Sequence, residues 1–385
     1  MFTRNSDIKF VGVNDDKIDL FEGQYPVPEG ISYNSYIIDS GEIAVMDSVD
    51  VNFGEVWLSQ IDRELDGRSP GYIVVQHVEP DHSGSLELFL RKYPEAKVVA
   101  TVSAVNMLQN FIRDVDVKER SVTVRDGDTL TVGTHVLRFL TAPLVHWPEV
   151  MVTLDESNGV LFSADAFGTF SHYDTLAGWD DEARRYYCNI VGKFGRNVQN
   201  LLAKIKDLKF NTVAPLHGPV LTENLAHYWT LYDKWSSYTP ERKGVLVAYA
   251  SVYGGTAKAA RELAMMLCER GAEVKVIDLC REHFSLAVAE AFRYDSMALC
   301  AVTYDGDLFP PMYNFLHHLA LKNFGGRKVA VIENGSWAPV AGRKMIEMIK
   351  EMKNMTVVSP VVTIKSRMSE IDRLTMAGVA DELVR

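Results

Sequence analysis

The sequence predicts an α/β protein in two parts, in which two helix-covered sheets precede a doubly wound sheet of five parallel strands. Over the first two-thirds of the 385 residues, short β-rich runs alternate with amphipathic helices. A polar segment that contains a proline interrupts this pattern between Trp235 and Gly244. Beyond it, strand-like and helical runs alternate regularly, as in doubly wound parallel sheets. We therefore expect one domain over residues 1–240 and a second over 241–385.

In the first part, β-branched and aromatic runs indicate strands, and helical periodicity indicates amphipathic helices. The clustered short strands in its middle fit two sheets covered by helices. In chain order, we expect strands at 31–38 and 43–47, a helix at 53–65, strands at 72–76, 121–124, 129–132, 136–141, 150–154 and 160–163, a helix at 180–208, a strand at 212–214 and a helix at 222–235.

The second part has the regular βαβ pattern. Its apolar runs are short enough for buried strands, and the segments between them are amphipathic. We expect strands at 245–250, 274–278, 296–303, 328–333 and 356–358, with helices at 256–270 and 312–323, one from about 340, and one at 369–383.

Composition excludes several classes of partner and site. The net charge of -11 and the pI near 5.4 argue against nucleic acid or an anionic membrane surface, which bind cationic faces. The sequence has neither an apolar run long enough for a membrane span nor an apolar leader, so we expect a cytoplasmic protein. The cysteines, Cys188, Cys268, Cys280 and Cys300, are too widely spaced for a rubredoxin module or a zinc ribbon.

A cluster of metal-ligand residues follows the apolar strand at 72–76. The next six residues, His77-Val78-Glu79-Pro80-Asp81-His82, offer two imidazoles and two carboxylates. A rigid strand end followed by a short loop can aim several side chains at one point. Three isolated ligand types also follow strand-like segments further along the chain: His146, Asp165 and His217. The seven residues are enough for two metal ions that share a bridging carboxylate.

A second candidate site lies at the first βα junction of the second part. The loop between the strand at 245–250 and the following helix supplies hydroxyls, glycines and backbone N–H groups at a helix N-terminus, which is typical of a phosphate site. Its residues are Ser251, Val252, Tyr253, Gly254, Gly255 and Thr256.

Two later loops should lie at the same edge of the sheet, because the carboxyl ends of parallel strands meet there. Both combine glycine, aromatic side chains and backbone donors that could surround a flavin ring. One contributes Thr303, Tyr304, Asp305, Gly306 and Asp307, and the other contributes Asn334, Gly335, Ser336 and Trp337.

The metal-ligand pattern resembles the metallo-β-lactamase fold, an αββα sandwich. Those hydrolases usually have a histidine where this chain has Glu79, and a hard oxygen ligand favours iron or manganese over zinc. With Glu79 included, the pattern resembles that of the flavodiiron proteins. The later segment resembles a flavodoxin domain, so the resemblance covers essentially the whole chain. It extends to Tyr33-Asn34-Ser35-Tyr36 and His146-Trp147-Pro148.

The resemblance implies the cofactors and their ligands. His77, Glu79 and His146 would bind one iron, Asp81, His82 and His217 the other, and Asp165 would bridge them. The counterpart of His82 is not a ligand in every member of the family. The second domain would bind FMN, since it has room for one phosphate and no adenine-binding module.

The resemblance also implies an oxidoreductase that reduces dioxygen to water, nitric oxide to nitrous oxide, or both. FMN would relay electrons from an external donor: a rubredoxin-like protein, a flavin reductase or a reduced deazaflavin. A separate donor is expected because no such segment follows Arg385. The implied assembly is a head-to-tail homodimer or a dimer of dimers. The preferred gas, the donor and the choice between dimer and tetramer stay open.

Two other hypotheses are consistent with parts of the sequence. One is a zinc-dependent hydrolase of the metallo-β-lactamase type with a flavodoxin-like regulatory domain, against which Glu79 argues. The other is an electron carrier or redox sensor with a vestigial metal site, against which the seven filled ligand positions argue.

Overall fold

A computed structural model describes residues 6–385, and its chain forms two compact units. The first unit comprises residues up to Tyr187 together with Arg196–Thr230, and the second comprises Cys188–Gly195 and Leu231–Arg385. The chain therefore contributes a short segment near residue 190 to the second unit, returns to the first, and passes to the second again within a helix near residue 230. The domain boundary at residue 240 remains a prediction.

The first unit contains a six-stranded and a five-stranded sheet. The six-stranded sheet has the order β1-β6-β7-β8-β9-β10, and the other has the order β11-β12-β13-β14-β15. The six strands of the first sheet are β1 (Ile8–Phe10), β6 (Tyr36–Asp39), β7 (Ile43–Met46), β8 (Tyr72–Val74), β9 (Lys97–Thr101) and β10 (Ser121–Val124). Those of the second are β11 (Thr129–Val132), β12 (His135–Thr141), β13 (Met151–Asp155), β14 (Val160–Phe162) and β15 (Thr212–Ala214).

The inner faces of the two sheets share one buried core. Ile38, Met46 and Val74 come from the first sheet, and Phe139 and Phe162 come from the second. Alternation of apolar and polar residues along each strand directs these side chains inward. Two short pairs, β2 (Val13–Asp15) with β5 (Ile31–Tyr33) and β3 (Leu20–Phe21) with β4 (Tyr25–Pro26), lie outside the main sheets.

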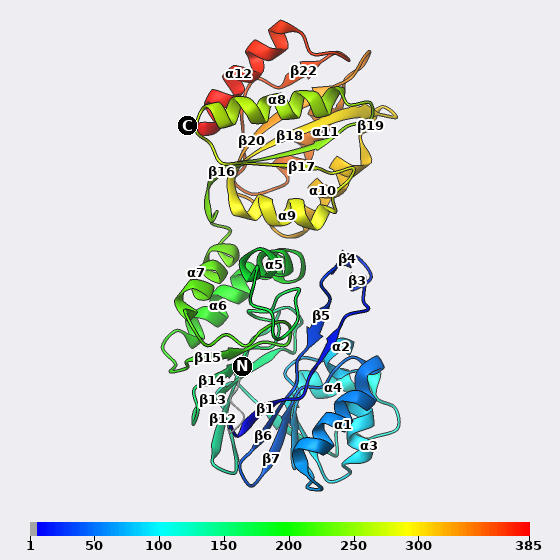
Figure 1. The fold of residues 1–385 in the computed structure, drawn as a ribbon, viewed down its shortest axis with the longest axis vertical. Coiled ribbons are helices and arrows are strands. Elements are labelled where there is room, and N and C mark those ends of the chain that lie inside the picture. The colour runs from blue at the N-terminus through cyan, green and yellow to red at the C-terminus, as the bar shows by residue number, and fades with distance from the viewer. Residues whose placement is uncertain (1–5) are drawn as a thin grey trace. The chain divides into compact units, whose positions relative to one another are not determined.

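Helices cover the outer faces of this unit, with α1 and α3 on one side and α6 on the other (Figure 1). Thus the unit has the αββα layering that the sequence predicts. The helices are α1 (Gly54–Leu65), α2 (Pro80–Ser83), α3 (Leu86–Lys92), α4 (Val102–Phe111), α5 (Trp179–Tyr186), α6 (Gly195–Ile205) and α7 (Leu225–Ser236), the last of which crosses the division between the units.

The second unit is built on a parallel sheet with the order β17-β16-β18-β20-β21. The helices α8 and α12 pack on one face, and α9, α10 and α11 lie on the other (Figure 1). Its strands are β16 (Arg242–Ala250), β17 (Val274–Asp278), β18 (Tyr294–Tyr304), β19 (Asp307–Leu308), β20 (Lys328–Asn334), β21 (Thr356–Val357) and β22 (Val362–Ile364). Its helices are α8 (Gly255–Glu269), α9 (Phe284–Arg293), α10 (Pro310–Leu321), α11 (Ala341–Lys350) and α12 (Glu370–Val384).

Some local predictions were wrong or incomplete. The helix expected at 180–208 is two α-helices, α5 and α6, separated by a π-helical turn at Tyr187–Val191 and a 3-10 turn at Gly192–Phe194. The sequence interpretation also missed α9, whose first turn is capped by the side chain of His283 through the N–H of Ser285. Finally, the strand expected at 31–38 is two strands, β5 and β6, which belong to different sheets.

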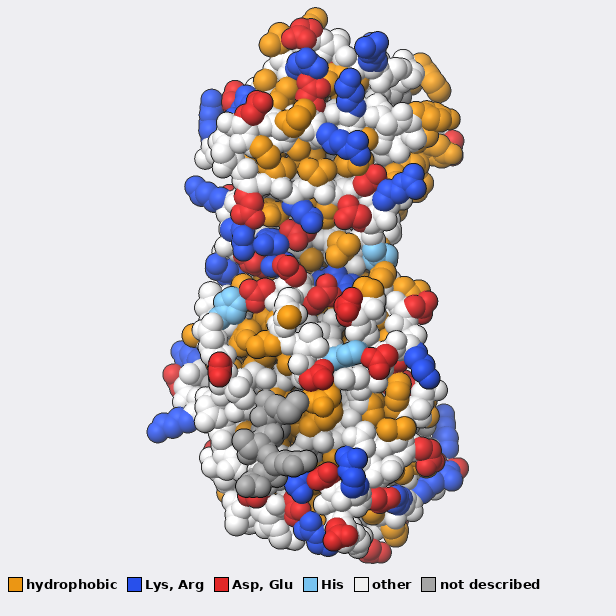
Figure 2. Space-filling view, in the orientation of Figure 1, with side chains coloured by type: hydrophobic (Ala, Val, Ile, Leu, Met, Phe, Trp, Pro, Cys, Tyr) orange, Lys and Arg blue, Asp and Glu red, His pale blue; other side chains and the backbone are white. Residues whose placement is uncertain are grey.

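Charged side chains of both signs are mixed on the surface. On the face shown in Figure 2, Lys and Arg side chains are interspersed with Asp and Glu in both units. Across residues 6–385, none of the helices combines the length and the apolar character that a bilayer crossing requires.

Candidate metal centre and flavin site

All seven predicted metal ligands converge in the first unit. They form two neighbouring groups, and within each group the ligand atoms all lie within 4.8 Å of one another. His77, Glu79, His146 and Asp165 make up the first group, which we call metal pocket 1. Asp81, His82 and His217 make up the second, which we call metal pocket 2.

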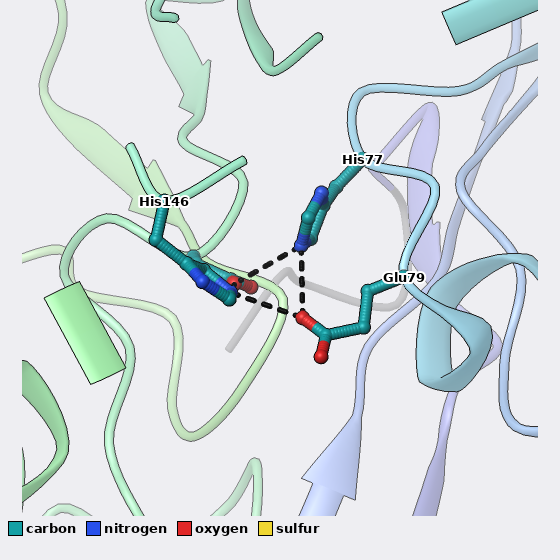
Figure 3. A group of neighbouring side chains, drawn as sticks. His77, Glu79 and His146 are labelled. Carbon is teal, nitrogen blue, oxygen red and sulfur yellow. Dashed lines mark hydrogen bonds and ion pairs between the residues drawn. The ribbon is translucent and has the colours of Figure 1, made fainter. Parts of the chain in front are cut away.

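Metal pocket 1 draws its side chains from three loops. Figure 3 shows the imidazoles of His77 and His146 and the carboxylate of Glu79 pointing toward one another. Glu79 Oε2 lies 3.2 Å from His77 Nε2 and 3.0 Å from His146 Nε2. The fourth atom, Asp165 Oδ2, lies 3.0 Å from His146 Nε2 and 3.5 Å from His77 Nε2.

Metal pocket 2 receives the other carboxylate oxygen of Asp165. This oxygen, Oδ1, lies 3.5 Å from His82 Nε2 and 3.9 Å from His217 Nε2. Asp81 Oδ2 lies 3.2 Å from His82 Nε2 and 3.3 Å from His217 Nε2. Because its two oxygens face different pockets, the Asp165 carboxylate has the position of a bridging ligand.

Sheet topology explains why these loops meet. β14 and β15 pair in parallel, so the loops that follow them leave the same edge and bring Asp165 close to His217. β7 and β8 also pair in parallel, which places the residue after β7, Asp47, beside the loop of His77. Asp47 accepts hydrogen bonds from the backbone N–H (2.7 Å) and the side-chain amide (2.8 Å) of Gln76. Burial raises the pKa of Asp47 to about 6, although the bonds from Gln76 oppose that rise.

Residues 33–36, which lead into β6, bond to the loops that carry the metal ligands. Asn34 Nδ2 donates to the carbonyl oxygens of Pro215 and Gly218, both at 2.8 Å. Tyr36 donates its hydroxyl to Pro215 at 3.1 Å, and Ser35 donates its hydroxyl to the carbonyl of Asp47 at 2.9 Å. The Tyr33-Asn34-Ser35-Tyr36 motif therefore positions the ligands without contributing one.

The cluster favours positive charge. Burial acts to lower the pKa of His146, but Asp165 and Glu79 outweigh it and raise that pKa to about 9. In the same way, burial opposes ionisation of Glu79, yet His146 and His77 lower its pKa to about 2. The pKa of Asp165 also lies well below its ordinary value, because His77 and His146 overcome its burial. The carboxylates thus stabilise cations here, whether protonated imidazoles or a bound metal ion.

Aromatic rings enclose the imidazole of His217. The ring centroids of Phe21, Tyr33 and Tyr186 lie 5.3, 6.0 and 5.5 Å from that of His217. On the other side of the cluster, the Trp147 ring packs edge-on against His77 at 5.4 Å. These rings limit the access of water to the ligand atoms.

The predicted phosphate loop leads from β16 into α8. The backbone N–H of Gly254 donates to the Ser251 hydroxyl at 3.1 Å, and Gly254 has a φ of +84°, which favours glycine. Thr256 is buried in the first turn of α8, whereas Tyr253 is 100% exposed and Val252 is half-exposed. The loop therefore offers backbone N–H groups at the start of a 15-residue helix.

The loop after β18 is a tight β-hairpin. Tyr304 pairs with Asp307, and the two turn residues, Asp305 and Gly306, have φ values of +48° and +72°. The hydroxyl of Thr303 accepts hydrogen bonds from the N–H groups of Val340 and Ala341 at the start of α11, at 2.9 and 3.1 Å. Thr303 thus caps a helix, and a contact of these residues with flavin remains a prediction.

The loop after β20 is joined to a segment that the sequence analysis did not single out. The Asn334 side chain donates to the carbonyl of Ser366 (3.1 Å) and accepts from its N–H (3.0 Å), and the hydroxyls of Ser336 and Ser366 lie 2.6 Å apart. A Cβ at Gly255 would lie 3.0 Å from the Ser366 carbonyl oxygen, so this segment also touches the phosphate loop. Trp337 is 86% exposed, while Gly335 donates its N–H to Ile364.

Comparison with known proteins places this architecture in a family. The model of the ODP family beta lactamase matches residues 31–218. Diflavin flavoprotein A 1 of Synechocystis sp. is 32% identical over 68% of this chain. A flavo di-iron protein of Thermotoga maritima superposes with a TM-score of 0.88 at 25% identity, over 98% of this chain and 95% of that one. The chain belongs to the flavodiiron protein family.

The family assignment confirms the predicted fold class. This flavodiiron chain combines a metallo-β-lactamase-like αββα sandwich with a flavodoxin-like sheet of strand order 2-1-3-4-5. An anaerobic nitric oxide reductase flavorubredoxin of Vibrio vulnificus is 29% identical over 86% of this chain and 69% of its own length. By contrast, the chain spans about half of the Synechocystis relative, 46% of its length.

Proposed function

We propose that this protein is a flavodiiron oxidoreductase that reduces dioxygen to water, nitric oxide to nitrous oxide, or both, with electrons relayed by FMN from an external donor. The observation that carries the proposal is the Asp165 carboxylate, whose two oxygens face two separate groups of imidazole and carboxylate ligands. The similarity to a protein named as a nitric oxide reductase supports it.

The donor set fits a pair of iron ions. With Asp165 shared, each pocket has two imidazole nitrogens and two carboxylate oxygens. Such mixed nitrogen and oxygen ligation, with a carboxylate where the zinc hydrolases of this fold usually have a histidine, suits iron. We therefore assign His77, Glu79 and His146 to one iron, Asp81, His82 and His217 to the other, and Asp165 to both.

When bound, two irons and FMN would together supply the four electrons that convert dioxygen and four protons to two waters, or the two that convert two nitric oxides and two protons to nitrous oxide and water. The chain's own residues arrange this chemistry. Asp165 sets the separation of the pockets, and Asn34 and Asp47 hold the ligand loops. Phe21 and Tyr186 exclude water from the side of His217.

The flavodoxin-like unit would hold FMN at the carboxyl edge of its sheet. The N-terminus of α8 and the loop from Ser251 to Thr256 suit a phosphate monoester. Asn334 and Ser336, joined to Ser366, lie beside that loop. Tyr304 and Trp337, which are half-exposed and exposed, remain our candidates for contact with the flavin ring.

We further propose that the active assembly is a head-to-tail homodimer or a dimer of dimers, in which FMN of one subunit serves the metals of another. The electron donor would be a rubredoxin-like protein, a flavin reductase or a reduced deazaflavin. A basic donor surface would complement the net charge of -11.

Metal and flavin stoichiometry of anaerobically purified protein tests the proposal, followed by consumption of dioxygen and nitric oxide after chemical reduction. We expect two irons and one FMN per chain, with consumption of at least one of the gases. The relative rates would then rank the substrates. Zinc in both pockets without reductive turnover, together with hydrolysis of an ester, would overturn the proposal in favour of the hydrolase.

A further inference from the structure

The ligand atoms themselves do not distinguish the two metal pockets. Each has two histidine Nε2 atoms and a carboxylate of its own, and the two share Asp165. Both pockets lie in the interior of the same unit, and their histidines are buried. The groups that bond to the far sides of these side chains are a further source of a difference in metal affinity.

The histidines differ in what their Nδ1 atoms bond. His77 Nδ1 lies 2.8 Å from Glu149 Oε1, whereas His217 Nδ1 lies 2.7 Å from the backbone carbonyl oxygen of Ser32. A carboxylate and a carbonyl only accept hydrogen bonds, so Nδ1 is the donor in both cases. In the neutral form of both rings, the hydrogen is therefore on Nδ1, and Nε2 is left to bind a metal ion in the pockets. Only the partner of His77 is an anion.

Glu149 lies directly beside metal pocket 1 and contacts the loop of His77. Its side chain is fully buried, and Oε1 also accepts the backbone N–H of Val78 at 3.0 Å. Its backbone carbonyl accepts the hydroxyl of Thr101 at 3.0 Å. Because Glu149 follows His146 by three residues, one carboxylate joins the loop of His146 to the loop of His77 and Glu79.

An anionic hydrogen-bond partner makes the opposite ring nitrogen a stronger metal ligand, and it adds negative charge next to the bound cation. A neutral carbonyl partner does this less. We propose that Glu149 is a positioning residue that makes metal pocket 1 the tighter pocket, so that the protein fills with divalent metal in a fixed order, pocket 1 before pocket 2.

The inference rests on the part of the proposed function that places two metal ions in this cluster. It does not depend on gas reduction, because filling order is a property of metal binding. The probe can therefore be Co2+, whose visible absorption reports coordination without any turnover.

The experiment is an anaerobic titration of the metal-free full chain with Co2+, monitored by visible absorption and by calorimetry. Wild-type protein should bind in two steps of different affinity. Asp81→Ala, which damages pocket 2, should keep the tight step, and His146→Ala, which damages pocket 1, should keep only the weak one. A single step that takes up two Co2+ per chain, or a tight step that survives in His146→Ala, would overturn the filling order while leaving the two-metal site intact. A stoichiometry of one Co2+ per chain in wild-type protein would instead contradict the two-metal proposal itself.

Glu149→Gln tests the source of the difference, because glutamine retains the shape and an accepting oxygen but removes the charge. We expect the tight step to weaken by roughly 10- to 100-fold and the weak step to stay unchanged. Glu149→Ala, which also removes the hydrogen bond, should weaken it further. An unchanged tight step in Glu149→Gln would exclude the role of Glu149.

The matched control is Asp155→Asn. Asp155 is a buried carboxylate that accepts from His135 Nδ1 at 2.8 Å in the same unit, and neither residue belongs to a metal pocket. We expect both Co2+ steps to be unchanged in this variant. An equal weakening in Asp155→Asn would show that loss of any buried carboxylate disturbs the site and would overturn the inference. The titrations of Asp81→Ala and His146→Ala test the filling order even if Glu149→Gln does not fold.

Discussion

Asp165 contributes to both metal pockets through one side chain. Its Oδ2 lies 3.0 Å from His146 Nε2, and its Oδ1 lies 3.5 Å from His82 Nε2. The carboxylate is buried, and the surrounding imidazoles hold its pKa well below the ordinary value against the effect of burial. Because the two pockets share this carboxylate, its loss removes an oxygen ligand from each of them.

Asp165→Ala should therefore lower the metal content and abolish gas reduction while leaving FMN bound. Elemental analysis and flavin absorbance of the purified variant measure both effects. Asp180→Ala is a suitable control, because it removes an exposed carboxylate bonded to His227. A variant of Asp165 with two metals and full activity would show that the ligand set is wrong.

Thr256 is the residue of the phosphate loop that most directly tests FMN binding. Its side chain is buried in the first turn of α8, so valine should fit with little disturbance. We expect Thr256→Val to weaken FMN binding by roughly 1.5 to 3 kcal/mol, because a hydrogen bond to a charged phosphate is lost. Fluorescence titration of the flavin-free protein measures this. Thr375→Val, in α12, should leave the affinity unchanged, and an unchanged affinity in Thr256→Val would remove Thr256 from the site.

A buried pair of titratable side chains joins two neighbouring strands of the second sheet. β12 and β13 pair antiparallel, and a buried His135–Asp155 pair joins the first residue of one to the last residue of the other. The hydrogen bond to Asp155 raises the pKa of His135, although burial opposes the shift. Protonated His135 is therefore more favourable in the folded chain than in the unfolded one.

This pair predicts a pH-dependent contribution to stability. Because the folded pKa of His135 is raised, the contribution is fully present below the unfolded pKa of about 6.5 and is lost as pH rises through the folded pKa. Asp155→Asn should lower the free energy of unfolding by about 1 to 3 kcal/mol at pH 6 and by less at pH 9. Urea denaturation at both pH values measures the difference. An equal loss at the two pH values would show that the charge on His135 does not contribute.

The chain as a whole brings a metal-ligand cluster and a flavin-type phosphate loop into one polypeptide, each within its own compact unit. Electron transfer between the two sites requires them to approach one another. The proposed head-to-tail homodimer meets that requirement through a second copy of the chain.

If this assembly is the active form, gas reduction per chain should fall when the protein is diluted below its dimer dissociation constant. Light scattering would measure the molar mass, and gas consumption would be assayed over the same concentration range. FMN content per chain serves as the control, because flavin loss on dilution would mimic dissociation. A monomer with full activity would contradict the proposed assembly.

Much of the site was accessible from local sequence. His77, Glu79, Asp81 and His82 lie within six residues after a strand, and strand ends aim side chains predictably. His146, Asp165 and His217 became candidates because each follows a strand-like run, but each is a weak signal alone, and the resemblance to the flavodiiron pattern supplied the full set. The phosphate loop was predicted from its place between a strand and a helix, and its contact with FMN stays a prediction.

The residues that support the site left no comparable signal. Glu149 bonds to His77 across 72 residues, and Ser32 bonds to His217 across 185. Asp47 and Ser366 likewise show no distinctive local pattern in the sequence, because their partners, Gln76 and Asn334, are distant in the chain. The strand expected at 43–47 even included Asp47, which lies directly after β7 in the structure.

The sequence was sufficient to determine where most strands lie, which residues are candidate ligands, and the acidic net charge. Periodicity and strand ends are set by a few neighbouring residues, and net charge follows from composition. Tertiary structure alone decided that one carboxylate faces two metal pockets and that only one of two histidines is backed by an anion. Those features depend on contacts between loops far apart in the chain, which exist only after the parallel strands bring the loops to one edge of the sheets.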